Sequence, residues 1–146
     1  MTRPSPTQVY LDMCRELRKL ATCVRGQHAA LMVGTDKHVV SMGYNGSPHG
    51  QPHCVDDGCL MDDSHCTRCI HAELNMLLFA DPSRSRGSTV YITGRPCFRC
   101  ATALVQVGVR AIIVDGRNQA YTTDDHLTSA MWTMFERAGV QYEVVQ

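Results

Sequence analysis

Eight of the 146 residues are cysteines, and six of these lie between Cys54 and Cys100. The chain has no run of about 18 apolar residues and no signal-type core after Met1, so we expect a cytosolic protein. Reducing compartments disfavour disulfides, and clustered cysteines there more often bind metal or carry out chemistry. A chain of this length also folds without cross-links. The cysteines therefore predict metal binding, with a disulfide framework as the alternative.

The composition is typical of one globular domain over residues 1–146. Hydrophobic residues make up 44% and charged residues 19%, and no linker or low-complexity tract interrupts the chain. Lys+Arg and Asp+Glu balance at 14 each. Because phosphate neutralisation supplies most non-specific affinity for nucleic acids, zero net charge argues against a nucleic-acid partner. We expect no membrane partner either, which leaves small polar substrates.

Hydrophobic spacing predicts helices and strands in alternation. The expected strands cover residues 29–34, 39–43, 89–93, 111–114 and 140–145. Four helices are expected. The first is capped by Ser5 and has an apolar face of Val9, Met13, Leu17, Leu20 and Val24. The second runs from Ile70 with Leu74, Leu77 and Leu78, the third covers residues 97–107, and the last is capped by Asp124 and carries Leu127, Met131, Met134 and Phe135. This order predicts an α/β domain whose central mixed sheet of about five strands has helices on both faces.

The segment from Gly46 to Cys69 interrupts this regularity. Gly, Pro, His, Asp and Cys dominate it, and no hydrophobic period survives. A structureless segment of this length in a compact domain needs a function or a metal to order it.

Two short segments carry the chemistry: His71-Ala72-Glu73 and Pro96-Cys97-Phe98-Arg99-Cys100. Cys97 and Cys100 are three residues apart at an expected helix start, so their sulfurs face the same way and the positive helix end favours thiolates. His71 supplies a third ligand from another helix start. Three protein ligands plus water is the catalytic arrangement of zinc, whereas four ligands make a structural site.

Glu73 follows His71 by two residues, close enough to reach a water on the metal without being a ligand. A carboxylate in that position can take the water's proton and pass it on. The alternative is a structural zinc site with Glu73 as a solvated surface charge. The pairing of both segments favours the catalytic interpretation.

The H-x-E and P-C-x-x-C segments resemble the signature of zinc nucleobase deaminases. The resemblance narrows to the deoxycytidylate (dCMP) deaminase family, including bacterial competence-type and phage members, and covers about residues 20 to 145. It is carried further by Gly43-Tyr44-Asn45-Gly46-Ser47-Pro48-His49-Gly50, by His71-Ala72-Glu73-Leu74-Asn75 and by Ala138-Gly139-Val140. It implies a three-layer α/β/α cytidine-deaminase-like fold and conversion of dCMP to dUMP and ammonia, with Glu73 carrying protons.

Substrate-binding residues are predicted less directly. Asn75 and Asn45 are amide candidates for the sugar or base, with turn or cap roles as the alternative. Arg25, after the first helix, and Tyr121, before the last helix, are candidates for the 5′-phosphate, which needs positive charge or donors. A solvated surface role is the alternative for both.

The remaining cysteines predict a second, structural zinc that orders residues 46–69. The resemblance to phage members implies Cys23 and Cys54 as ligands, and Cys66 and Cys69 complete the predicted set, with Cys59 or His65 as substitutes. The competing interpretation is free thiols in a mobile loop.

The resemblance also implies a hexamer activated by dCTP and inhibited by dTTP. The effector site, with Mg²⁺ on the nucleotide, would be lined by Gly43, Tyr44, Asn45, Gly46 and Gly50. Glycines let backbone amides approach phosphates, but a plain turn would use the same residues.

The chain departs from the family where members usually carry Val-Gly-Ala, because His28-Ala29-Ala30 enters the first strand here. A side chain at this position narrows the space that a glycine leaves near the pocket. The functional alternatives are deamination of 5-methyl or 5-hydroxymethyl dCMP, or of another nucleoside or base, and a non-catalytic zinc-organised binding module in which Glu73 is dispensable.

Overall fold

A five-stranded mixed sheet forms the centre of the computed structural model, which describes residues 1–117 and 128–146. The strand order is β2-β1-β5-β6-β7. β1 (Ala29–Val33) pairs antiparallel with both β2 (Val39–Tyr44) and β5 (Thr89–Ile92). β5, β6 (Ala111–Asp115) and β7 (Gln141–Val145) run parallel. The predicted mixed sheet of five strands is confirmed.

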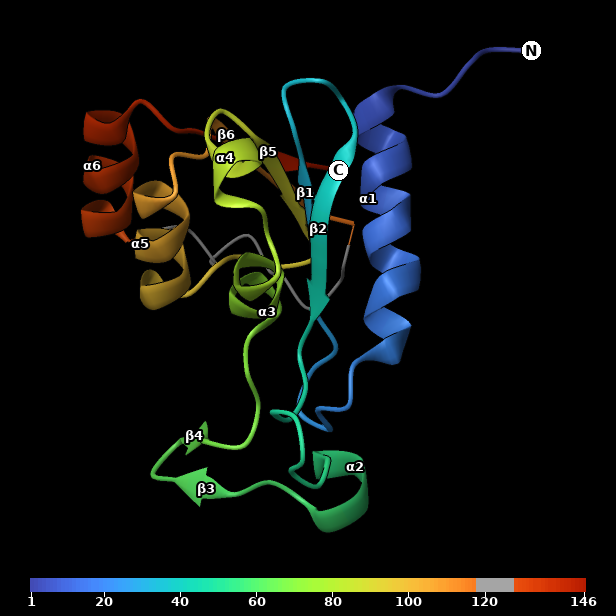
Figure 1. The fold of residues 1–146 in the computed structure, drawn as a ribbon, viewed down its shortest axis with the longest axis vertical. Coiled ribbons are helices and arrows are strands. Elements are labelled where there is room, and N and C mark those ends of the chain that lie inside the picture. The colour runs from blue at the N-terminus through green and yellow to red at the C-terminus, as the bar shows by residue number, and fades with distance from the viewer. Residues whose placement is uncertain (118–127) are drawn as a thin grey trace.

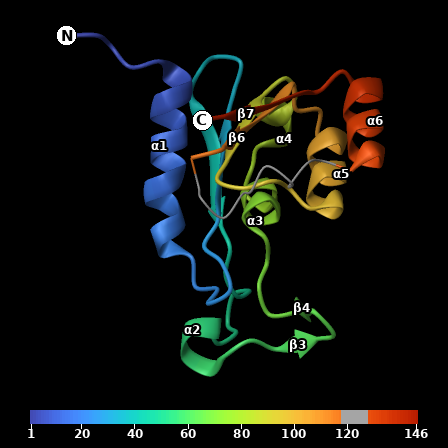
Figure 2. The same ribbon diagram turned by 180° about the vertical axis from the view of Figure 1, so that it is seen from behind.

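Helices cover the two faces of the sheet unequally. α1 (Pro6–Leu17) lies on one face, and α3 (Ala72–Leu78), α5 (Phe98–Gln106) and α6 (Ser129–Ala138) lie on the other (Figures 1 and 2). Alternate residues of β1 serve the two sides, because successive side chains of a strand point to opposite faces. Leu31 packs in the cluster with α1, whereas Met32 belongs to the larger core on the opposite face. The three-layer α/β/α prediction is therefore confirmed.

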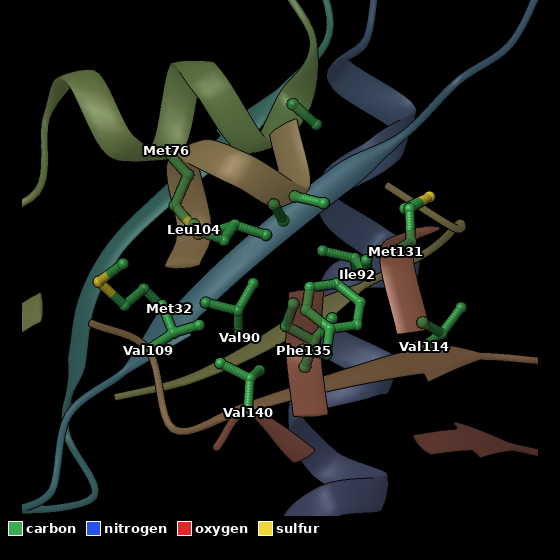
Figure 3. Close-up of a cluster of buried hydrophobic side chains, with 14 residues drawn as sticks. Met32, Met76, Val90, Ile92, Leu104, Val109, Val114, Met131, Phe135 and Val140 are labelled. Atoms are coloured by element: carbon green, nitrogen blue, oxygen red, sulfur yellow. The ribbon is translucent and has the colours of Figure 1, made fainter. Parts of the chain in front are cut away.

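The larger core fixes the helices that carry the site. Figure 3 shows Met76 of α3 and Leu104 of α5 against Val90 and Ile92 of β5. Phe135 of α6 is 1% exposed in the same cluster. The starts of α3 and α5 are thus held against one sheet face by apolar packing.

The predicted apolar face of the first helix is wrong. Ser5 caps α1 as expected, but the helix buries Leu11 and Cys14, while Val9 and Met13 are 40% and 43% exposed. α1 ends at Leu17, before a 3₁₀ turn (η1, Arg18–Leu20) whose Leu20 is exposed, as is Val24. Apolar residues occur on two faces of this helix, and packing against β1 and β5 selects the face that meets Tyr91.

The predicted face of the second helix is confirmed for Leu77, which packs against the core, but the residues buried most deeply are different ones. α3 starts at Ala72, buries Ala72, Glu73 and Met76, and leaves Leu78 69% exposed. Its backbone lies directly on β2, because a Cβ at Gly43 would collide with backbone atoms of Ala72 and Met76. Because α3 approaches β2 this closely, Glu73 and Met76 face inward and Leu78 faces outward.

Two other boundaries differ from expectation. A short helix, α4 (Pro82–Ser85), lies before the strand at residues 89–92, where none was expected, and is capped by Asp81, whose Oδ1 accepts a hydrogen bond from Ser83 N at 2.9 Å. α6 begins at Ser129 with Thr128 as its N-cap. The predicted cap Asp124 and Leu127 lie outside the described residues.

The irregular segment projects beyond one end of the sheet (Figure 1). It contains only α2 (Cys54–Asp57), β3 (Met61–Asp62) and β4 (His65–Cys66) as regular elements. Gly46 and Ile70 exchange backbone hydrogen bonds of 3.2 and 2.8 Å at its base. Among the described helices, none combines the length and the apolar character that crossing a membrane requires.

Candidate active site

His71, Cys97 and Cys100, which we call the His–Cys trio, meet at the starts of two helices. His71 is the N-cap residue of α3, Cys97 is the N-cap of α5, and Cys100 lies in the first turns of α5. The Nδ1 atom of His71 is 3.5 Å from each of the two sulfurs. A tetrahedral zinc with ordinary Zn–N and Zn–S lengths gives ligand-to-ligand edges of about 3.5 Å for such a pair. Both distances from His71 therefore match those of a tetrahedral zinc site.

The trio already carries the charge that a metal ligand needs. Hydrogen bonds from the Cys100 thiol and then from His71 lower the pKa of Cys97 to about 3. The Cys97 sulfur also accepts the backbone N–H of Cys100 at 3.5 Å, at the positive end of α5. The contact with Cys97 raises the pKa of His71 in return. Cys97 is therefore a thiolate at neutral pH, the form that binds metal.

Glu73 points its carboxyl group at the trio from the first turn of α3. Its side chain is buried, with 8% of the residue exposed, and it hydrogen-bonds the Cys100 thiol. Burial raises the pKa of Glu73 to about 7. A buried carboxyl group with a pKa near neutrality, next to a metal-binding trio, is suited to accepting and returning protons.

A cavity of about 420 Å³ opens beside the trio. His71, Glu73 and Cys97 line one part of it, and Arg25 and Asn45, both predicted from the sequence, line another. Other lining residues were not predicted to lie at a substrate cavity, and they include His28, Ser64, His65, Gly94 and Arg95. Arg95 directly precedes Pro96-Cys97, and this adjacency to the motif is a signal that could have identified it.

The predicted substrate residues are placed differently from one another. Arg25 lines the cavity, and its Nη1 donates a hydrogen bond to the Ser64 carbonyl at 2.9 Å. Asn45 also lines it, but its amide holds the preceding turn, with Oδ1 accepting from His28 N at 2.8 Å and Nδ2 donating to Gly26 O at 2.7 Å.

Asn75 is not brought to this cavity. Asn75 donates from Nδ2 to the Tyr44 carbonyl at 2.9 Å and is absent from the described cavity lining. Its amide thus ties α3 to the end of β2. Tyr121 lies outside the described residues.

Four cysteines of the irregular segment gather with Cys23, which lies between η1 and β1, and we call the five the thiol cluster: Cys23, Cys54, Cys59, Cys66 and Cys69. The sulfurs of Cys54, Cys59 and Cys66 all lie within 4.8 Å of one another and could hold a metal ion. The Cys54 sulfur is 3.7 Å from that of Cys66 and 3.5 Å from that of Cys69, close to the edge of about 3.8 Å in a tetrahedral zinc–thiolate site.

The metal-type group within the thiol cluster differs from the expected ligand set, because Cys23 and Cys69 lie outside it. Cys59, predicted only as a substitute, belongs to the tightest group. Cys23 contacts Cys69, and burial together with hydrogen bonds that the Cys69 thiol donates to Cys54 and Cys23 raises the pKa of Cys69. His65 is not part of the metal-type group found among the described residues, and its Nδ1 lies 3.2 Å from Ser64 Oγ.

The predicted effector residues have clear structural roles. Gly43 gives α3 room to approach, Tyr44 is half-buried at the end of β2, and Gly46 pairs with Ile70. Gly50 has a φ of +78° and no atom within 4 Å of the place its Cβ would occupy, so its role is conformational.

Comparison with known proteins places this geometry among deaminases. The family model for the cytidine and deoxycytidylate deaminase zinc-binding region matches residues 4–115. The chain is 36% identical to ComE operon protein 2 of Bacillus subtilis (strain 168), with 100% of this chain and 74% of that protein covered. It is 30% identical to the deoxycytidylate deaminase of Mycobacterium phage D29, with 77% of this chain and 96% of that protein covered.

The same fold occurs in solved structures. The crystal structure of the dCMP deaminase from cyanophage S-TIM5 in complex with dCMP and dUMP has a TM-score of 0.74 and 22% identity, and the match covers 99% of this chain and 100% of that one. The chain spans 44% of the length of the deoxycytidylate deaminase of Schizosaccharomyces pombe (strain 972 / ATCC 24843), to which it is 28% identical.

Proposed function

Because the chain belongs to the cytidine and deoxycytidylate deaminase zinc-binding family, we propose that it catalyses the hydrolytic deamination of dCMP to dUMP and ammonia. The observation that carries this proposal is the buried Glu73 beside the His–Cys trio, at the wall of one cavity. Relatives that bear the name deoxycytidylate deaminase support dCMP as the substrate.

The His–Cys trio would hold zinc through His71 Nδ1 and the sulfurs of Cys97 and Cys100. When bound, zinc supplies Lewis acidity, which lowers the pKa of water from 15.7 to about 7. Two thiolates and one imidazole leave one tetrahedral corner for water, as in catalytic zinc sites.

Glu73 performs the proton transfers. Its carboxylate accepts a proton from the attacking water, whose oxygen bonds to C4 of the pyrimidine, and delivers that proton to N3. Glu73 then takes the hydroxyl proton of the tetrahedral carbon and delivers it to the amine, which leaves as ammonia while C4 becomes a carbonyl. The pKa of about 7 allows the group to serve as base and acid in turn.

The cavity provides polar groups for the rest of the nucleotide. Arg25 and His65 lie on its wall with Ser64, and a guanidinium is well suited to a phosphate. Asn45 contributes through the turn that it holds over residues 26–28. We expect the 5′-phosphate near Arg25 and the base near Glu73.

Ammonia release tests the proposal. Wild type and Glu73→Ala are assayed with dCMP, 5-methyl-dCMP, cytidine and dCTP. We expect dCMP to be the preferred substrate and the variant to be inactive. Equal activity in Glu73→Ala contradicts the mechanism, preference for another substrate changes the assignment, and no release from any of them favours the zinc-organised binding module.

A second zinc in the thiol cluster forms part of the same proposal. It is supported by the sulfur separations around Cys54 and by the scarcity of other packing in this segment. Regulation by dCTP and dTTP, with Mg²⁺ on the nucleotide, and a hexameric assembly stay predictions from the family resemblance. Opposite shifts of the dCMP saturation curve by the two triphosphates would support the regulation.

A further inference from the structure

His28 lies at one end of the central sheet, directly before β1, and is half-buried. The backbone around it is held on both sides, because the Asn45 side chain accepts from His28 N and Asn45 N donates to the His28 carbonyl at 3.2 Å. Ala29 N donates to Thr93 Oγ1 at 3.0 Å, and Thr93 N donates to Ala29 O at 3.1 Å. His28 is therefore anchored between two strands, and its position is set by the fold.

The imidazole of His28 forms part of the wall of the cavity that contains His71 and Glu73. The ring lies over Gly26, where a Cβ would be 3.1 Å from His28 Nε2. Within residues 1–117 and 128–146, no hydrogen bond reaches either ring nitrogen of His28. A half-buried ring with unsatisfied nitrogens at a cavity wall is available to a ligand.

Electrostatics fix the state of this ring. Burial lowers the pKa of His28, and the charges of His71 and Arg18 lower it further. The ring is therefore neutral at pH 7, with one N–H donor and one acceptor nitrogen. A neutral imidazole recognises a carbonyl group better than a phosphate, for which the cavity already has Arg25.

The proposed reaction limits which atom of the substrate the His28 N–H can contact. C4 of the base must lie at the His–Cys trio and N3 at Glu73, so the remaining polar atom of the pyrimidine ring is the C2 carbonyl oxygen. His28 lines the same cavity as His71 and Glu73, which hold this end of the base.

We propose that His28 is a specificity-determining residue whose ring N–H donates a hydrogen bond to the C2 carbonyl of the bound pyrimidine. This inference rests on the proposed function, because the orientation of the base follows from it. The contact selects 2-oxopyrimidine nucleotides and is independent of the phosphate.

The test uses the zinc-loaded full-length chain and the variants His28→Val, which removes the donor, and His28→Gln, which keeps one. His38→Val, at the exposed hairpin turn, is the matched control. We expect His28→Val to lower kcat/KM for dCMP about tenfold, the size of one hydrogen bond, and His28→Gln to restore part of it. No loss in His28→Val overturns the proposal.

Product binding identifies the contacted atom. Inhibition constants are measured for dUMP, deoxyuridine and 2-thio-dUMP, whose sulfur is a weaker acceptor. In His28→Val we expect dUMP and deoxyuridine to weaken by the same factor, and 2-thio-dUMP to lose its disadvantage against dUMP. A loss confined to dUMP assigns His28 to the phosphate, and an unchanged disadvantage of 2-thio-dUMP assigns it elsewhere; either outcome overturns the proposal.

A measurement on the unsubstituted protein covers the case of a variant that fails to fold. The imidazole ¹⁵N signals of His28 should shift when deoxyuridine is added to the wild type, and unshifted signals overturn the proposal. If the wild type releases no ammonia from dCMP, the proposed function fails, whereas these binding measurements still report on the His28 contact.

Discussion

The His–Cys trio and the thiol cluster are both metal-type groups, but the fold supports them differently. The trio stands at the starts of α3 and α5, whose buried residues Met76 and Leu104 pack on the sheet. The thiol cluster comes from a segment with very short regular elements, where Val55 and Leu60 are more than half exposed. Packing fixes the geometry of the trio, whereas the order of the cluster depends on what the sulfurs bind.

The two groups also differ in chemistry. The trio offers three ligands and has the buried carboxyl group of Glu73 beside it. The cluster offers five sulfurs, and its metal-type group contains no carboxylate. A site with an open corner and a proton carrier performs reactions, and a site closed by thiolates stabilises structure. Substitutions that affect one group and leave the other intact can test this division.

The largest effect should come from Glu73→Gln, which keeps the shape of the side chain and removes its proton chemistry. We expect kcat for dCMP to fall by about 10²- to 10⁴-fold, the usual contribution of a general acid–base. Zinc content, measured by mass spectrometry of metals, should not change. Glu136→Gln on the exposed side of α6 is the control and should keep full activity. Loss of zinc from Glu73→Gln would mean that the carboxylate is a ligand.

We expect acid to lower kcat through Glu73, beside the trio, before it affects the thiol cluster. Burial raises the pKa of Glu73 to about 7, so the carboxylate needed to accept a proton from water is lost as pH falls through that value. A bound cation favours the carboxylate, which moves the midpoint to pH 7 or below. We expect kcat to fall about tenfold per pH unit on this limb. A profile that is flat from pH 5 to 8 would contradict the role of Glu73.

A smaller effect on catalysis is expected from Cys54→Ser, at the centre of the thiol cluster. The variant should lose one zinc per chain, and the backbone amides of residues 46–69 should exchange hydrogen faster, because the sulfurs order this segment. Deamination should fall by less than about tenfold, since the trio is held by other contacts. Cys14→Ser is the control, because Cys14 is buried in the α1 cluster away from both groups. One zinc per chain in the wild type would contradict the second site.

The sequence predicted the parts of the molecule that local patterns determine. The five strands, the cap at Ser5, and the convergence of His71 with Cys97 and Cys100 follow from spacing and turn chemistry. These features depend on neighbours in the chain or on a motif whose chemistry needs the residues together.

The inward faces of α1 and α3 could not be predicted in the same way. Both helices carry more apolar residues than one face can hold, so the partner surface decides which are buried. On α3 the decision falls to Gly43, whose missing side chain lets Glu73 and Met76 face inward and leaves Leu78 outside. From the sequence, His28 appears only as a departure from the family. Its place at the cavity wall depends on Gly26, Asn45 and His71, which only the fold brings together.

The smallest effect on catalysis is expected from two glycine substitutions, Gly43→Ala beside α3 and Gly50→Ala in the irregular segment. Together they test how the fold supports the trio and the thiol cluster. Gly43→Ala puts a methyl group against backbone atoms of α3, which cannot rotate away, and should lower the free energy of unfolding by about 1–3 kcal/mol. Gly50→Ala meets no atom but is strained at φ +78°, which costs about 1–2 kcal/mol. Denaturant unfolding and kcat are measured for both. Because only Gly43 supports the helix that carries His71 and Glu73, we expect kcat to fall a few-fold in Gly43→Ala and to stay unchanged in Gly50→Ala. Equal kcat values in the two variants would show that the trio tolerates movement of α3, and the contrast in support between the two regions would then be wrong.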